Sequence, residues 1–168
     1  FNIGNCFFEL SDFKNAQYFF EKAILYKNDY AISFNNLGLT HRELGNFSVA
    51  IHNFQKAIFY NKDFYEAYNN LGNIYMDLNQ SDKALNYYRR SFELNPDYNN
   101  SINNIAISLE NKGNVNEALT FFQKIDTKTN NSEMIKNLSL NQLSSFNFYE
   151  GWKNYKHRFF SKGFQIDK

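Results

Sequence analysis

Asparagine side chains recur along this chain at a fixed interval, and their amide groups have the chemistry to bind a polypeptide backbone. Successive members of the column lie 34 residues apart, except for a last step of 33. An amide offers two N–H donors and an oxygen acceptor, so it can pair with a peptide N–H and C=O together. The members of this asparagine column are Asn2, Asn36, Asn70, Asn104 and Asn137.

More asparagines surround the column, and we predict that all of them contact a bound peptide. These are Asn35, Asn69, Asn103 and Asn73. One such hydrogen bond contributes about 0.5–1.5 kcal/mol net, so several are needed for useful affinity. A structural interpretation remains open beside this one, because an asparagine on a helix can also bond a neighbouring repeat or face solvent.

The fixed period predicts the elements that position these amides. A period of this length indicates an array of one small unit. Within a unit, apolar residues recur at helical spacing, as Phe34, Leu37 and Leu44 do in one half. We therefore predict an all-α fold, a right-handed superhelical solenoid of helix-turn-helix repeats whose first helices line the inner surface.

The repeat limits follow from the same register. We predict a partial repeat at 1–30, repeats at 31–64, 65–98 and 99–131, an atypical terminal helix pair at 132–160, and a tail or linker at 161–168. Pro96 is expected to end the second helix of its repeat because proline cannot continue the hydrogen-bond ladder. The residues predicted to separate the two helices of a repeat are Gly45-Asn46, Asn79-Gln80-Ser81 and Gly113-Asn114.

Small residues recur where the two helices of a pair must touch. Those on the first helices are Gly4, Gly38, Gly72 and Ala106, and those on the second are Ala16, Ala50, Ala84 and Ala118. A glycine inside a helix costs about 0.5–1 kcal/mol relative to alanine, so its recurrence needs a packing reason. We expect an aromatic side chain, such as Tyr75 or Phe54, to fill the space beside each small residue.

Together these positions resemble the tetratricopeptide repeat. The matching residues are the pairs Leu37-Gly38 and Leu71-Gly72, the aromatic Tyr75, the second-helix patterns Ala50-Phe54-Ala57 and Ala16-Phe20-Ala23, and the terminal Pro96. His41 stands where the motif has its tyrosine. The asparagine column is similar to that of the O-linked N-acetylglucosamine transferase superhelix, which implies that its five members contact a peptide.

The C-terminal part has a second, narrower resemblance. Glu150-Gly151-Trp152, followed by Tyr155 and Arg158, resembles the last repeat-like helix of bacterial tetratricopeptide proteins that continue into a glycosyltransferase-like region. The alternative is that Trp152 and the following aromatic residues simply close the hydrophobic end of the array, since terminal repeats are usually atypical.

Charge and cysteine content limit the partner classes. The net charge is +1, from 18 basic and 17 acidic residues, so bulk electrostatics favours neither nucleic acid nor an anionic membrane as a partner. No apolar run approaches the roughly 20 residues of a membrane helix. Cys6 is the single cysteine and is expected to be buried; it fits a reducing compartment, and we predict a cytoplasmic protein.

Catalytic patterns are missing from the sequence. His41, His52 and His157 lie in no metal-binding spacing, and His41 is expected to be a core residue. We therefore predict no cofactor, no metal and no enzyme activity for this segment. The residues expected around the asparagine column form a mixed polar lining in which neither sign of charge dominates. They are Asn73, Arg42, Glu43, Met76, Asp77 and Glu110.

The functional expectation is a protein-protein interaction module that binds a protein or an extended peptide in its concave groove. Because the chain begins with Phe1 inside a repeat, we expect a part of a longer protein. One alternative is the substrate-recognition arm of a glycosyltransferase. Another is an assembly scaffold that self-associates through the ends of the solenoid. A lysine-rich clamp for a C-terminal carboxylate is not expected, because Asn35 and Asn69 occupy its positions.

Overall fold

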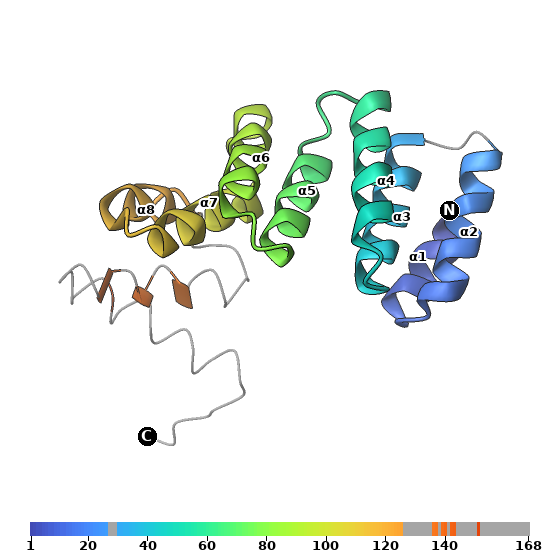
Figure 1. The fold of residues 1–168 in the computed structure, drawn as a ribbon, viewed down its shortest axis with the longest axis horizontal. Helices are drawn as coiled ribbons and strands as arrows, with labels where there is room; N and C mark the ends of the chain where they lie inside the picture. Colours follow the sequence, from blue (N-terminus) through green and yellow to red (C-terminus); the bar gives the residue numbers. More distant parts are fainter. Residues whose placement is uncertain (27–29, 126–135, 138, 141, 144–150, 152–168) are drawn as a thin grey trace, which may run out of the picture. The chain divides into compact units, whose positions relative to one another are not determined.

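The structure, a computed structural model, consists of α-helices. It describes residues 1–26, 30–125, 136–137, 139–140, 142–143 and 151, and among these the eight full helices are joined by turns, without a strand. They are α1 (Asn2–Glu9), α2 (Phe13–Leu25), α3 (Tyr30–Glu43), α4 (Phe47–Tyr60), α5 (Tyr65–Asp77), α6 (Ser81–Leu94), α7 (Asn99–Asn111) and α8 (Val115–Phe122) (Figure 1). The predicted all-α helical repeat fold is confirmed.

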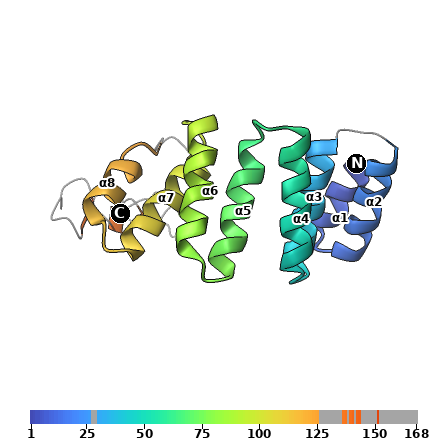
Figure 2. The ribbon, with the colours of Figure 1, turned by 45° about the horizontal axis from the view of Figure 1, so that its top comes forward.

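The chain divides into two compact units, Phe1–Pro96 and Asp97–Lys168. In the first unit, each of the helices α1 to α5 packs against the next helix along the chain. Figure 2 shows α3 beside α4 and α5 beside α6, as expected for paired helices. In the second unit, α7 packs against α8 in the same way.

An aromatic ring fits against a glycine in three successive helix pairs. A Cβ atom on Gly38 would lie 2.7 Å from the ring of Phe54, and one on Gly72 would lie 2.3 Å from the ring of Tyr88. Real Cβ atoms do not approach other atoms so closely, so only glycine lets the ring reach the helix backbone. The predicted role of Phe54 is confirmed.

The third pair follows the same rule, with one difference from the sequence expectation. A Cβ atom on Gly4 would lie 2.8 Å from the ring of Phe20. Tyr75, which we expected beside a small residue, lies flat against Tyr87 instead, with ring centroids 5.2 Å apart. The four alanines of the second helices are fully buried, as close packing requires; they are Ala16, Ala50, Ala84 and Ala118.

The turn between the two helices of a repeat has the same backbone conformation each time. Its key position has a positive φ of 59° at Ser11, 75° at Gly45, 57° at Asn79 and 80° at Gly113. This left-handed conformation ends a helix and favours glycine. The predicted breaker segments therefore separate helices as expected, and α6 ends two residues before Pro96.

Cys6 is exposed rather than buried, so that expectation was wrong. The residues at the same repeat position in α3 and α5, Thr40 and Ile74, are both fully buried. Those helices pack against a second helix of the preceding repeat, α2 and α4 respectively, whereas α1 packs mainly against α2. The helix position of Cys6 next to Phe7 and Phe8 suggested burial, but burial requires a neighbouring helix on that side.

Much of the predicted terminal helix pair at 132–160, and all of the tail at 161–168, lie outside the described residues. So do Trp152, Tyr155 and Arg158 of the glycosyltransferase-like pattern. Gly151 is described and buried, and a Cβ atom there would lie 2.8 Å from the side chain of Leu143. In the part of the chain that is described, no helix has the length and apolar character needed to cross a membrane.

Candidate peptide-binding surface

The structure separates the predicted asparagines into two groups. Asn35, Asn69 and Asn103 are 6 %, 3 % and 8 % exposed and belong to the core. The residue that follows each of them is half-buried, as is Asn73, while Asn2 is exposed. The half-buried members of the asparagine column are Asn36, Asn70, Asn104 and Asn137. For peptide contact itself, all nine residues stay predictions.

Three of these side chains and Asn5 form a continuous chain of amide hydrogen bonds across three helices. Asn70 Nδ2 on α5 donates to Asn35 Oδ1 on α3 at 3.0 Å. Asn35 Nδ2 donates in turn to the adjacent Asn36 Oδ1 at 3.3 Å. Asn36 Nδ2 then donates to Asn5 Oδ1 on α1 at 2.9 Å. This amide chain links the first helices of three successive repeats.

The same relationship recurs in the second unit. Asn137 Nδ2 donates to Asn103 Oδ1 at 3.2 Å, and these residues are 34 apart, almost the spacing of Asn70 and Asn35. The alternative interpretation of the column, hydrogen bonding to a neighbouring repeat, is therefore confirmed for Asn36, Asn70 and Asn137.

The repeat pattern of the sequence did not point to Asn5 as a partner in the amide chain. The position 34 residues before Asn35 is occupied by Phe1, which has no side-chain acceptor. Asn36 therefore bonds Asn5 instead, one turn further along α1. A signal was available in the sequence, because a break in the Asn-Asn pattern leaves the next amide in need of another partner.

The amide chain leaves donors unused on half-buried side chains. Each amide nitrogen has two N–H groups, and Asn36 and Asn70 each use one of them. Asn5 accepts a hydrogen bond through Oδ1, and its two N–H groups have no side-chain partner among the residues that the structure describes. The bonds already formed restrict the rotation of these side chains and so fix the direction of the remaining donors.

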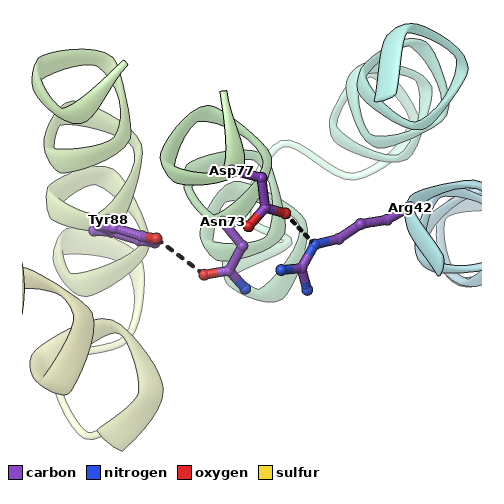
Figure 3. A network of polar contacts seen from close by, with 4 residues as sticks. All are labelled: Arg42, Asn73, Asp77 and Tyr88. Atoms are coloured by element: carbon purple, nitrogen blue, oxygen red, sulfur yellow. Dashed lines mark hydrogen bonds and ion pairs between the residues drawn. The ribbon is translucent and has the colours of Figure 1, made fainter. Parts of the chain in front are cut away.

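A second polar cluster lies nearer the C-terminal ends of α3 and α5. Arg42 Nε lies 2.7 Å from Asp77 Oδ2, and their side chains are 29 % and 32 % exposed. Tyr88 donates a hydrogen bond from its hydroxyl to Asn73 Oδ1 at 3.0 Å. Figure 3 shows Asn73 and Asp77 on α5, between Arg42 on one side and Tyr88 on the other.

Both ends of this cluster have shifted pKa values. The hydrogen bond to Asp77 raises the pKa of the Arg42 guanidinium. Burial, and secondly the charge of Asp77, raise the pKa of the Tyr88 hydroxyl. Arg42 therefore keeps its positive charge, which is paired with Asp77, and the Tyr88 hydroxyl stays neutral and donates its hydrogen bond. The cluster joins α3, α5 and α6 and leaves no unpaired charge on Arg42.

A small pocket adjoins the amide chain. Its volume is about 200 Å³, and it lies among α1, α2 and α3. It is lined by Asn5, Phe8, Glu9, Phe20, Asn36 and Leu39. We call it the Glu9 pocket. Among the lining residues Phe20 is fully buried, whereas Glu9 is exposed.

Metal-ligating side chains do not gather in the part of the chain that the structure describes. Within that part, no three His, Cys, Asp or Glu side chains come together in a group suited to a metal ion. His41 is buried in the core, as expected. Its Nδ1 atom has no hydrogen-bond partner, and burial lowers the pKa of its imidazole against a smaller opposing effect of Glu21.

Solved structures with a similar fold include tetratricopeptide repeat proteins. A crystal structure of MamA has a TM-score of 0.72 and 20 % sequence identity, over 96 % of this chain and 95 % of that one. YrrB, described as a TPR protein with an unusual peptide-binding site, has a TM-score of 0.65 and 20 % identity, over 94 % and 82 % of the two chains. At such identities the likeness shows the fold alone. No curated protein sequence matches the chain.

Family models match the sequence directly. Models described as tetratricopeptide repeat match residues 1–30 and 65–98, and one described as TPR repeat matches residues 39–78. Together they span more than half of the chain and fall on the helix pairs of the first unit. The chain therefore belongs to the tetratricopeptide repeat proteins, a family whose stacked helix pairs serve as protein-interaction modules.

Proposed function

We propose that this protein binds an extended peptide segment of a partner along the half-buried amides of Asn36 and Asn70. The supporting observation is the amide chain, which holds both side chains by inter-repeat hydrogen bonds of 2.9 and 3.0 Å. Each keeps one N–H group available for a peptide carbonyl. Because both side chains are already ordered in the free protein, binding costs little side-chain entropy.

The spacing of the two amides suits an extended chain. The hydrogen bond from Asn70 to Asn35 requires the first helices of adjacent repeats to be near neighbours, at a typical helix-packing distance of about 10 Å. An extended peptide covers about 10 Å in three residues. One peptide carbonyl in every three therefore lies within reach of an asparagine, irrespective of the peptide's side chains.

The test is a binding screen followed by paired substitutions. An array of random 12-residue peptides identifies binders, and fluorescence anisotropy of labelled binders measures the affinity. Removing two hydrogen bonds of about 0.5–1.5 kcal/mol each with Asn36→Ala plus Asn70→Ala should weaken binding by about fivefold to a hundredfold. The matched control is Gln55→Ala plus Asn86→Ala, which removes two exposed amides from the second helices α4 and α6.

The control should bind like the unmodified protein. The proposal fails if no peptide of the array binds in solution, or if the two double variants bind equally well. Circular dichroism at the assay temperature shows that each variant is folded, so that lost binding is not lost structure.

Two narrower functions stay predictions. A glycosyltransferase arm rests on the resemblance of the asparagine column and on a C-terminal pattern of which only Gly151 is described. The test is whether a sugar-nucleotide-binding α/β region follows Lys168 in the complete protein. Self-association through the ends of the solenoid has one supporting observation, the exposure of Ile3 and Leu10 at α1. Sedimentation velocity over a range of concentrations tests it.

A further inference from the structure

The Glu9 pocket differs from the corresponding place between the next two first helices. Between α3 and α5, the guanidinium of Arg42 extends to Asp77 and ties the two helices together. The residues 34 positions earlier are Phe8 and Glu43. Phe8 cannot form the ion pair, so the protein's own cation is missing between α1 and α3, and the 200 Å³ pocket lies there.

The lining of the Glu9 pocket has an acceptor but no cation. Glu9 is exposed, and the structure shows no ion pair for it among the described residues. The other lining residues are two amides and three apolar side chains, of which Phe8 and Phe20 are aromatic. Aromatic faces and aliphatic walls suit the stem of a long cationic side chain, and a carboxylate suits its head.

We propose that the Glu9 pocket accepts a lysine or arginine side chain of the bound peptide. The ligand's stem lies against Phe8 and Leu39, and its charge points toward Glu9, the carboxylate that lines this pocket. This inference rests on the proposed function, because Asn36 belongs both to the pocket and to the amide chain. A peptide bound along the amides therefore passes the opening of the pocket.

The experiment compares peptides that differ at one side chain. The probes are fluorescein-labelled peptides of the form (Ala-Ser)₂-Xaa-(Ser-Ala)₂, in which Xaa is lysine, arginine, norleucine or glutamate. Norleucine keeps the stem of lysine without its charge. At low ionic strength, the lysine and arginine peptides should bind about threefold to fivefold more tightly than the norleucine peptide, because a partly exposed ion pair contributes up to about 1 kcal/mol.

The protein variants separate the pocket from general attraction between opposite charges. Glu9→Gln keeps the shape of the side chain and should reduce the preference for lysine over norleucine to less than about twofold. Asp63→Asn removes an exposed carboxylate from the turn between α4 and α5 and should leave the preference unchanged. Glu9→Lys should reverse it, so that the glutamate peptide binds more tightly than the lysine peptide.

The outcomes distinguish this inference from the proposed function. If lysine and norleucine peptides bind equally, and both lose affinity with Asn36→Ala plus Asn70→Ala, the cation pocket is wrong and peptide binding stands. If Asp63→Asn lowers the preference as much as Glu9→Gln does, the attraction is diffuse and the pocket is again wrong. If no peptide of the set binds, the proposed function fails and this inference fails with it.

Discussion

Asn70 donates a hydrogen bond to Asn35 across 3.0 Å, although the two residues are 35 apart in the sequence and lie on different helices, α5 and α3. The Asn-Asn pair of one repeat thereby performs two tasks. Its first member is buried and accepts from the next repeat, and its second is half-buried and keeps one N–H group that the amide chain does not use. Stacking of the repeats and presentation of the amides are therefore linked.

Removing the central member of the amide chain should destabilise the stack. Asn35→Ala deprives both Asn36 and Asn70 of a buried hydrogen-bond partner, so we expect the free energy of unfolding to fall by about 1–3 kcal/mol. Urea denaturation followed by circular dichroism measures the change. Asn86→Ala, an exposed asparagine on α6, should change it by less than about 0.5 kcal/mol; equal effects would show that the amide chain has no structural weight.

A methyl group on Gly72 should displace Tyr88. The added Cβ atom would lie 2.3 Å from the ring, and moving the ring also disturbs the hydrogen bond from its hydroxyl to Asn73. Overpacking of this kind costs about 1–3 kcal/mol, so Gly72→Ala should lower the thermal midpoint despite the better helix propensity of alanine. The informative comparison is the double variant Gly72→Ala with Tyr88→Leu, because a smaller side chain at position 88 leaves room for the methyl group and should restore part of the lost stability. Gly45→Ala does not serve as a control for overpacking, because its cost comes from the backbone conformation.

At the turn position with positive φ, a change to glycine should raise the free energy of unfolding, and a change to alanine should lower it. Ser11 adopts a φ of 59° and Gly45 a φ of 75°, and a side chain in this region costs about 1–2 kcal/mol. Ser11→Gly should therefore raise the free energy of unfolding by up to about 1 kcal/mol, and Gly45→Ala should lower it by about 1 kcal/mol. No atom lies within 4 Å of the added Cβ at Gly45, so the loss is not steric. Chemical denaturation of both variants tests the pair, and a loss for Ser11→Gly would contradict it.

His41 should make the protein less stable in mild acid. Burial lowers the pKa of its imidazole below 6.5 in the folded state, so between that lowered pKa and 6.5 the unfolded chain binds a proton that the folded chain does not. Stability is therefore unaffected by this group well above pH 6.5 and falls as the pH decreases through 6.5 toward the folded pKa. His41→Leu should reduce the loss of thermal stability between pH 7.5 and pH 5.

The histidine prediction has a matched control. Leucine is chosen because Leu109 is buried at the same repeat position in α7. His52→Gln alters an exposed histidine on α4 and should keep the pH dependence of the unmodified protein. If His41→Leu shows the same loss in acid as the unmodified protein, the acid sensitivity has another origin.

The ion pair between Arg42 and Asp77 should couple α3 to α5 in a salt-dependent way. Its atoms are 2.7 Å apart and its side chains are about one-third exposed, so we expect a coupling energy of about 0.5–1 kcal/mol. A double-mutant cycle with Arg42→Met and Asp77→Asn measures it through urea denaturation. The coupling should shrink in 1 M salt, where screening acts within about 3 Å; a coupling that is zero at low salt would show that the pair contributes nothing.

Much of the fold could be predicted from particular residues. The breakers at Gly45, Asn79 and Gly113 mark positions where the backbone turns left-handed, and Pro96 follows the end of α6. The fit of Phe54 against Gly38 also followed from the pattern, because a recurring glycine in a helix needs a close neighbour. These features depend on local conformational preference and on helical spacing, which are properties of short segments.

The candidate site needed the tertiary structure. The spacing predicted that Asn35 and Asn36 both contact a bound peptide, but the structure buries Asn35 and leaves Asn36 half-buried. The partner of Asn36 proved to be Asn5, and Cys6 proved to be exposed. Both differences arise at α1, where the regular neighbour of a repeat position is replaced or missing.

The sequence by itself determined that this protein is an array of tetratricopeptide helix pairs with asparagines at one repeated position, because a period and its apolar spacing specify each helix and the face it buries. Only the tertiary structure decided which amides bond to each other and where a pocket opens beside Glu9. The bonds from Asn36 to Asn5 and from Asn70 to Asn35 join side chains more than 30 residues apart, and their geometry depends on how neighbouring repeats pack rather than on the pattern within one repeat.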